Sequence, residues 1–151
     1  MDNMANDQLR VNNLQKVRQY IPSRNAHSFI ELAKTQAQKS NYGNFRHGAV
    51  LVSGGRVINT GYNKDRFTNF GSRFRPCGFG NATLHAELDA VLNMDRKKTQ
   101  GATIYVVRIS NDRDLFRNSK PCSMCHAALM FMGIKQVVYS SDENNFEAYT
   151  F

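Results

Sequence analysis

Apolar and polar positions alternate with two different periods along the chain, which indicates both strands and helices. Residues 47–53 and 56–63 are rich in β-branched and apolar side chains on either side of a Gly-Gly pair, so we predict a β-hairpin there. Two further short apolar runs, residues 102–109 and 136–140, have the composition of buried strands.

Helical spacing of apolar residues marks three other segments. Ser23 follows Pro22 and is a suitable N-cap for the first helix. Its apolar stripe consists of Phe29, Leu32, Ala33 and Ala37. Residues 85–98 form the second predicted helix, and residues 122–132 form the third, which Gly133 closes with a left-handed cap.

The two ends and one internal stretch have weaker patterns. Residues 1–22 have rough helical spacing and are interpreted as an N-terminal helical extension that ends at the proline. Residues 141–151 form an acidic tail of uncertain structure, and residues 64–84 form a long loop without periodicity. We therefore expect the 151 residues to form a single domain with a core at about residues 24–140.

The order of the predicted elements is helix, hairpin, helix, strand, helix, strand. Strands joined through helices imply a parallel part of the sheet, and the hairpin adds an antiparallel part. The pattern therefore predicts an α/β fold with a mixed central sheet covered by helices.

Composition restricts the environment of the protein. No apolar run approaches the roughly 20 residues of a membrane span, and the N-terminus lacks the basic-then-apolar order of a signal peptide. We expect a cytoplasmic protein without membrane partners. Three cysteines cannot all pair with one another, and in a reducing compartment they favour metal binding or catalysis.

The charge balance indicates what the protein binds. Twenty Lys and Arg against twelve Asp and Glu give a net charge of +8, which favours an anionic partner such as a nucleotide phosphate or a nucleic acid. The segment from Lys64 to Arg75 interleaves basic and aromatic residues that could stack on a base and hold a phosphate. The alternative is that its phenylalanines pack on the core and its arginines face water.

Three side chains have the chemistry of one metal site, and a carboxylate accompanies one of them. Cys122 and Cys125 form a Cys-x-x-Cys pair at the start of a predicted helix, and His85 and Glu87 form a His-x-Glu pair at the start of another. Two thiolates and one imidazole suit Zn²⁺ and leave its fourth position for water, as in catalytic zinc sites. Glu87 is then placed to move protons. Either motif alone would be weak, since a lone Cys-x-x-Cys can be redox-active or structural.

With these motifs the chain resembles the cytidine and deoxycytidylate deaminase superfamily. The resemblance rests on His85-Ala86-Glu87, on Pro-Cys-Ser-Met-Cys at residues 121–125, on the hairpin, and on the strand after Gly133. It implies a three-layer α/β/α fold, one catalytic zinc ion held by His85, Cys122 and Cys125, and Glu87 as the proton shuttle.

The resemblance also implies substrate contacts. Asn63 would contact the sugar or the base, and the backbone N–H of Ala86 would meet a base oxygen. Tyr139, at the end of a predicted strand, is a further candidate to flank the base, although a strand aromatic is more often packed in the core. Deaminases of this fold usually assemble, so a homo-oligomer is expected.

The substrate is less closely determined than the reaction. Gly-Tyr-Asn followed by a long insertion is similar to the deoxycytidylate branch, which predicts conversion of dCMP to dUMP and ammonia. Asp89 stands where that branch has asparagine. The alternatives are deamination of a base in a polynucleotide, such as a tRNA adenosine or single-stranded nucleic acid, and an inactive zinc-binding module.

The remaining candidate ligands are interpreted as structural. His47 beside the first strand could line the pocket but is assigned to packing, and His126 is interpreted as a packed or exposed histidine of its helix rather than a ligand. Cys77 is interpreted as a bystander thiol in the long loop, and His27 as a solvated surface residue.

Overall fold

A computed structural model describes residues 16–41, 43, 45–67 and 83–151 of the chain. Its elements are β1 (Arg18–Tyr20), α2 (Arg24–Gln38), β2 (Arg46–Ser53), β3 (Arg56–Tyr62), β4 (Lys64–Phe67), β5 (Thr83–Leu84), α4 (Ala86–Val91), α5 (Arg96–Thr99), β6 (Thr103–Ile109), β7 (Phe116–Arg117), α6 (Ser123–Phe131), β8 (Gln136–Asp142) and β9 (Asn145–Thr150). Within these ranges, none of the helices has the length and apolar character needed to cross a membrane.

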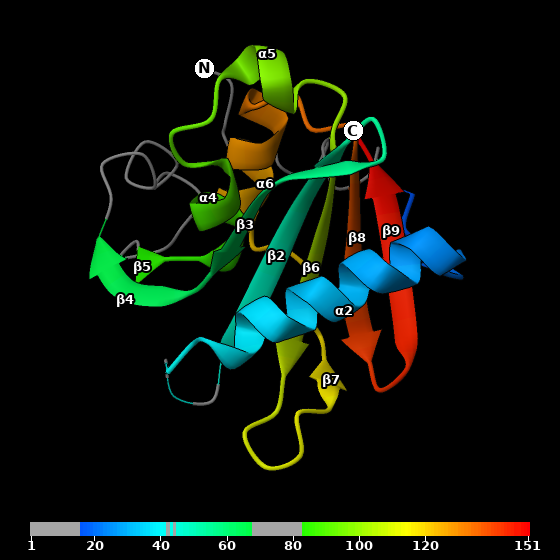
Figure 1. Ribbon diagram of the computed structural model, residues 1–151, viewed down its shortest axis with the longest axis vertical. Helices are drawn as coiled ribbons and strands as arrows, with labels where there is room; N and C mark the ends of the chain where they lie inside the picture. Colours follow the sequence, from blue (N-terminus) through cyan, green and yellow to red (C-terminus); the bar gives the residue numbers. More distant parts are fainter. Residues whose placement is uncertain (1–15, 42, 44, 68–82) are drawn as a thin grey trace, which may run out of the picture.

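Seven strands form one mixed sheet in the order β1-β9-β8-β6-β2-β3, with β7 paired to β6 (Figure 1). Strands β6 and β8 are parallel, and the other pairs of this sheet are antiparallel. The predicted mixed sheet is therefore confirmed. Strands β4 and β5 form a separate two-stranded sheet within the segment that we expected to be a loop.

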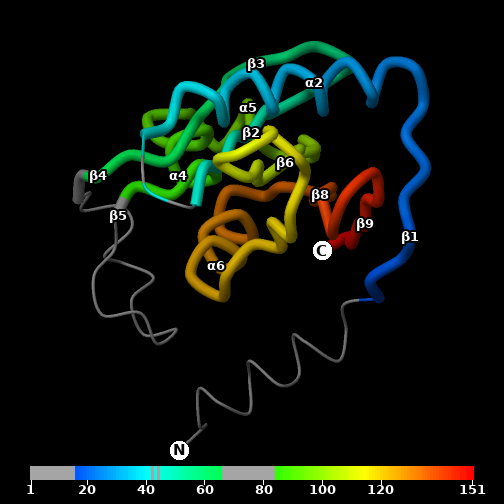
Figure 2. Tube along the Cα trace, turned by 90° about the horizontal axis from the view of Figure 1, so that it is seen from below, coloured from blue at the N-terminus to red at the C-terminus, as the bar shows by residue number. Residues whose placement is uncertain are grey.

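Helices cover both faces of the large sheet. Helix α2 crosses one face, and its Ala33 and Ala37 pack with Val50 and Val107. Helices α4 and α6 lie on the other face, where Ala86 and Leu129 belong to a second core cluster (Figure 2). The result is the three-layer arrangement that the resemblance implied.

Two glycines allow the helices to lie close to the sheet. A Cβ at Gly48 would lie 2.0 Å from the carbonyl oxygen of Ala33 in α2. A Cβ at Gly61 would lie 2.6 Å from the Ala86 carbonyl oxygen and 2.6 Å from the Ala90 nitrogen in α4. Only glycine fits these positions without moving a helix, so Gly61 determines how closely α4 approaches β3.

Several local predictions are confirmed. The side chain of Ser23 accepts a hydrogen bond from the Ala26 nitrogen and caps α2. The hairpin turns at Gly54 and Gly55, which both have positive φ. Gly133, with a φ of 74°, follows the end of α6 as expected.

The N-terminal helical extension predicted for residues 1–22 is wrong where the structure describes it. Residues 18–20 form strand β1, which pairs with β9 in antiparallel register, Gln19 opposite Glu147. Residues 1–15 lie outside the described residues. The segment becomes a strand because β9 offers it an unpaired edge, and such a partner is not visible in the local sequence pattern.

The end of the predicted core at residue 140 is also wrong. Strand β8 continues to Asp142, the chain turns at Asn144 with a φ of 61°, and β9 returns along β8. Phe146 and Ala148 in β9 are buried against the α2 face, and Tyr149 is buried against the α4 and α6 face. Asp142 and Glu143 lie at the turn and Glu147 lies between Phe146 and Ala148, so these acidic residues do not prevent the tail from completing the sheet.

The helix predicted for residues 85–98 is shorter and interrupted. Helix α4 ends at Val91, Asn93 has a positive φ of 62°, and Asp95 caps the new helix α5 by accepting a hydrogen bond from the Lys97 nitrogen at 2.9 Å. Asparagine and aspartate favour such breaks because their side chains bond to nearby backbone.

Replacing Gly61 by alanine tests the close approach of α4. We expect the free energy of unfolding to fall by about 3 kcal/mol or more, because the added methyl group meets backbone atoms that cannot move independently of the helix. Gly54→Ala is the control, because it meets nothing within 4 Å and suffers only from its positive φ, at about 1 kcal/mol. Denaturant unfolding of both variants measures the difference, and equal losses would contradict this role of Gly61.

Candidate metal centre

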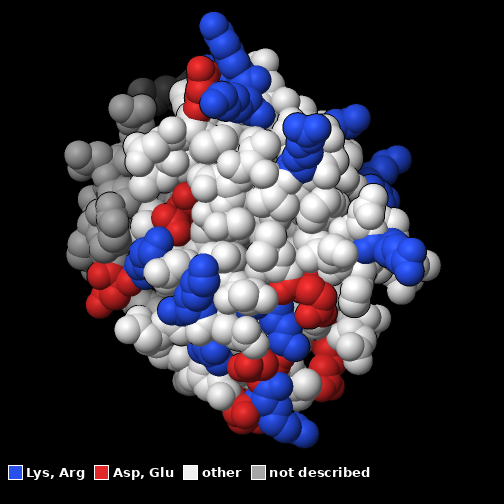
Figure 3. All heavy atoms as spheres, in the orientation of Figure 1, with Lys and Arg blue, Asp and Glu red and all other residues white. Residues whose placement is uncertain are grey.

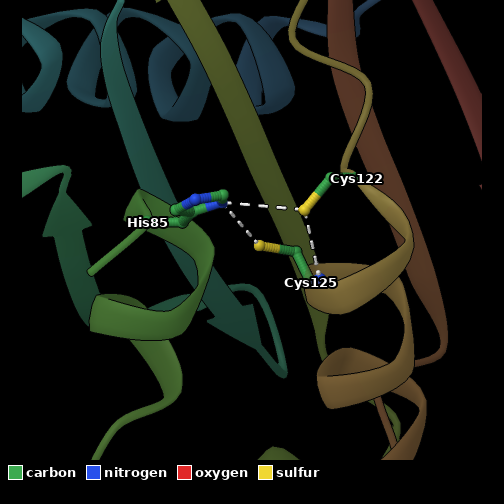
Figure 4. A group of neighbouring side chains, drawn as sticks. All are labelled: His85, Cys122 and Cys125. Carbon is green, nitrogen blue, oxygen red and sulfur yellow. Dashed lines mark hydrogen bonds between the residues drawn. The ribbon is translucent and has the colours of Figure 1, made fainter. Parts of the chain in front are cut away.

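Three side chains from two helix starts converge on one point (Figure 4). His85 precedes the first turn of α4, Cys122 is the N-cap of α6, and Cys125 lies in the first turn of α6. The Nδ1 atom of His85 lies 3.2 Å from the sulfur of Cys125 and 3.7 Å from the sulfur of Cys122. All three candidate ligand atoms lie within 4.8 Å of one another.

This triangle has the dimensions of a zinc site. Zn–S bonds of about 2.3 Å and Zn–N bonds of about 2.05 Å at tetrahedral angles place nitrogen and sulfur ligands about 3.5 Å apart. The two observed nitrogen–sulfur distances lie on either side of that value. The donor set also suits zinc, because thiolate and imidazole are the ligands this metal prefers. The residues present therefore fit a zinc ion with one coordination position left open.

Local interactions prepare one of the thiols for metal binding. Hydrogen bonds from the Cys125 side chain, from His85 and from the Cys125 backbone nitrogen lower the pKa of the Cys122 thiol to about 4, against the opposing effect of burial. Cys122 is therefore a thiolate at neutral pH, the form that binds metal. Burial raises the pKa of the fully buried Cys125 thiol, and a cation beside it favours its deprotonated form.

A buried carboxyl group lies next to the triangle. Glu87 is in the first turn of α4, two residues after His85, and only 5% of its surface is exposed. Burial raises its pKa, although the positive charge of His85 opposes this effect. A carboxyl group with a raised pKa exchanges protons more readily near neutral pH, which is what a proton shuttle requires.

Hydrogen bonds fix the helix that carries His85 and Glu87. Asp89 accepts one from the Tyr62 nitrogen at 3.1 Å and one from the Lys64 ammonium group at 2.7 Å. The side chain of Asn59 donates to the carbonyl oxygen of Ala90 at 2.8 Å. Together with Gly61, these contacts attach α4 to β3. From the sequence, Asp89 is visible only as a departure from the expected asparagine, and this role is not predicted.

A buried serine pair fixes the segment that carries Cys122. The Ser119 hydroxyl group donates to the Val106 carbonyl oxygen at 2.8 Å and lies 2.8 Å from the Ser140 hydroxyl oxygen. The Ser140 nitrogen in turn donates to the Ser119 hydroxyl oxygen at 3.0 Å. These contacts connect the chain three residues before Cys122 to strands β6 and β8. Neither serine can be identified from the sequence alone, because a buried polar pair has no periodic pattern.

The predicted substrate contacts have partners within the protein. The side chain of Asn63 accepts a hydrogen bond from the His47 nitrogen at 2.8 Å and donates to the carbonyl oxygen of Phe45. Tyr139 is buried and donates to Glu147 at 2.6 Å. Ala86, also buried, is the first residue of α4. Their contacts with substrate stay predictions.

The remaining sequence predictions concern His126, Cys77 and the basic and aromatic loop. His126 packs between aromatic rings, with Nδ1 3.2 Å from the Tyr149 hydroxyl oxygen and its ring centroid 4.8 Å from that of Phe151. This agrees with a structural role. Cys77 and most of the predicted basic and aromatic loop lie outside the described residues.

The family of this chain is identified by comparison with known proteins. A family model described as the cytidine and deoxycytidylate deaminase zinc-binding region matches residues 23–141, which contain the whole metal triangle and Glu87. The chain belongs to this family. The superfamily resemblance is thereby confirmed, and the cofactor is one zinc ion per chain.

Individual deaminases show the same relationship. A deoxycytidylate deaminase of Mycobacterium phage D29 is 30% identical over 129 residues, covering 76% of this chain and 92% of the phage protein. A deoxycytidylate deaminase of Schizosaccharomyces pombe is 35% identical over 128 residues, 77% of this chain. The match covers 37% of the yeast protein, so this chain spans little more than a third of that relative.

A solved structure supports the fold. The dCMP deaminase of cyanophage S-TIM5 superimposes with a TM-score of 0.56 at 21% identity, covering 83% of this chain and 88% of the phage chain. The α/β deaminase fold expected from the sequence is confirmed.

Replacing Cys122 by alanine removes one side of the zinc triangle. We expect the purified variant to lose its zinc, and to unfold at a lower temperature, because metal binding energy contributes to folding. Elemental analysis and thermal unfolding measure both effects. Met130→Ala, at an exposed position of the same helix, is the control and is expected to keep its zinc. A Cys122 variant with full zinc content would contradict the proposed ligand set.

Proposed function

We propose that this protein is a zinc-dependent hydrolytic deaminase of the cytosine base of a nucleotide, and that it converts dCMP to dUMP and ammonia. The observation that carries the proposal is the buried Glu87 beside the triangle of His85, Cys122 and Cys125. A purely structural zinc site has no use for a buried carboxyl group there. The similarity to two proteins named as deoxycytidylate deaminases supports dCMP as the substrate.

The reaction replaces the exocyclic amine at C4 of cytosine by the oxygen of water. When bound, zinc supplies a water molecule of lowered pKa at the open coordination position. The carboxylate of Glu87 would take one proton from this water and pass it to the ring nitrogen. It would then move the second proton, from the oxygen that has joined C4, to the departing amine, which leaves as ammonia. The raised pKa of Glu87 suits this relay, because the same group must accept and release protons.

The other residues of the site orient the reactants. His85, Cys122 and Cys125 would hold the zinc from the starts of two helices, and because they supply three ligands, a tetrahedral ion would keep its fourth position open. We propose that the backbone N–H of Ala86 binds a base oxygen, and that Asn63 contacts the sugar or the base. Tyr139 is proposed to flank the base from its strand.

An ammonia-release assay tests the proposed substrate. The zinc-loaded protein is offered dCMP, cytidine, deoxycytidine, a tRNA and single-stranded oligonucleotides, with expected turnover of dCMP above all others. Turnover of the tRNA or oligonucleotide alone, with a steep dependence on salt, would instead show a polynucleotide deaminase. A zinc-loaded protein that releases no ammonia from any of them would contradict a deaminase function.

Glu87→Gln tests the proton shuttle. We expect turnover to fall by at least about 100-fold, because general acid–base catalysis contributes about 10²- to 10⁴-fold and an amide cannot exchange the proton. Zinc content should stay at one ion per chain, since Glu87 is not a ligand. Glu31→Gln, the same substitution at an exposed position of α2, is the control. A Glu87 variant with undiminished turnover would refute the assigned role.

A further inference from the structure

Three basic residues form a row across neighbouring strands. His47 in β2 is the register partner of Arg108 in β6, and Arg108 is also the register partner of Arg117 in β7. Since neighbouring strands lie about 4.8 Å apart, the row spans roughly 10 Å. We call these three residues the basic row.

The basic row lies on the sheet face that carries the metal centre. Side chains alternate between the two faces of a strand. Ala49 and Val106, two residues from His47 and Arg108, pack in the core cluster that contains Ala86 of α4. Phe116, next to Arg117, packs in the cluster on the α2 face, so Arg117 takes the opposite face.

The row is also connected to the zinc site. Burial, the charge of Arg108 and then the charge of His85 lower the pKa of His47 to about 4, so His47 is neutral at pH 7 and the two arginines carry the charge of the row. The Ser140 hydroxyl group accepts a hydrogen bond from the Arg108 nitrogen at 3.2 Å and donates one to the Arg117 carbonyl oxygen at 2.7 Å. The same serine holds Ser119 in the segment that leads to Cys122.

Arg108 and Arg117 lie directly opposite one another, and like charges in such positions destabilise a sheet. Other basic residues near this end of the fold have acidic partners: Arg46 pairs with Asp114 at 2.9 Å, and Lys64 pairs with Asp89 at 2.7 Å. Arg117 is half-buried and, among the residues described, has no carboxylate oxygen within 4.0 Å. The guanidinium carbon of Arg108 lies 4.6 Å from the centroid of the Phe45 ring, which holds it in place.

We propose that the basic row binds the terminal phosphate of the nucleotide substrate while its base lies at the metal centre. A phosphate monoester carries about 1.5 to 2 negative charges at pH 7 and offers three strong acceptor oxygens, which suits two arginines side by side and a neutral imidazole that can donate one further hydrogen bond. A phosphodiester carries one charge and continues into further chain. The row therefore favours a mononucleotide over a polynucleotide.

The proposed phosphate site differs from the one that the sequence suggested. The sequence pointed to the segment from Lys64 to Arg75, but the Lys64 ammonium group already pairs with Asp89 and lies 4.1 Å from the centroid of the Tyr62 ring. The face over α2 shows basic and acidic side chains interspersed (Figure 3). The row lies on the opposite face, which holds the metal centre.

Arg117→Gln tests the row, and the test rests on the proposed deaminase function. The ratio of kcat/KM for dCMP to kcat/KM for deoxycytidine should fall by about 10- to 100-fold, the range for loss of a charge-assisted hydrogen bond. Arg117→Lys, which keeps the charge, should recover part of the loss. Arg113→Gln is the matched control, because this exposed arginine lies in the same connection between β6 and β7 and should keep the wild-type ratio.

Binding of dUMP and deoxyuridine, measured by calorimetry, separates failure of the row from failure of the function. If no pyrimidine substrate is turned over, the proposed function fails. The row is still supported if the wild-type protein binds dUMP more tightly than deoxyuridine and Arg117→Gln abolishes that difference. If dCMP is turned over and Arg117→Gln leaves the kinetic ratio unchanged, the row is refuted while the function stands. An equal effect of the variant on dCMP and on an internal cytosine of an oligonucleotide would contradict recognition of a terminal phosphate.

Discussion

The metal centre depends on one meeting point: the Nδ1 atom of His85 must lie beside two sulfur atoms that follow it by 37 and 40 positions in the chain. Because each ligand sits at the start of a helix, its position is set by how that helix packs on the sheet. Gly61 lets α4 lie against β3, and Asp89 and Asn59 bond it there. Ser119 fixes the approach to α6 in the same way. The geometry of the zinc site thus depends on groups that do not touch the metal.

Features decided by neighbouring residues could be predicted from the sequence. The Ser23 cap, the Gly-Gly turn and the end of α6 at Gly133 each depend on local backbone chemistry, and the structure has them where expected. The candidate ligands were also visible, because each motif occupies a few consecutive positions. Features decided by distant partners were missed. Strand β1 exists because β9 pairs with it, and the acidic residues of the tail concealed the buried Phe146 and Tyr149.

The same distinction applies to charge. The net charge of +8 follows from the sequence, but which basic side chains pair with acidic ones does not. Pairing of Lys64 with Asp89, and alignment of His47 with Arg108 and Arg117, follow from strand register. A slip of one residue would turn each side chain to the other face of the sheet, so no local pattern reveals the row. His47, which we had assigned to packing, gains a proposed binding role only once its register partner is known.

Zinc-edge X-ray absorption of the zinc-loaded protein tests the ligand set, because it reports the ligand atoms themselves. We expect one zinc ion with two sulfur ligands at about 2.3 Å and two lighter ligands at about 2.0 to 2.1 Å, one from His85 and one from water. Adding a cytosine nucleotide analogue should change the lighter shell and leave both sulfur ligands in place. A zinc ion with fewer than two sulfur ligands, or a shell in which four protein side chains leave no open position, would rule out this metal centre.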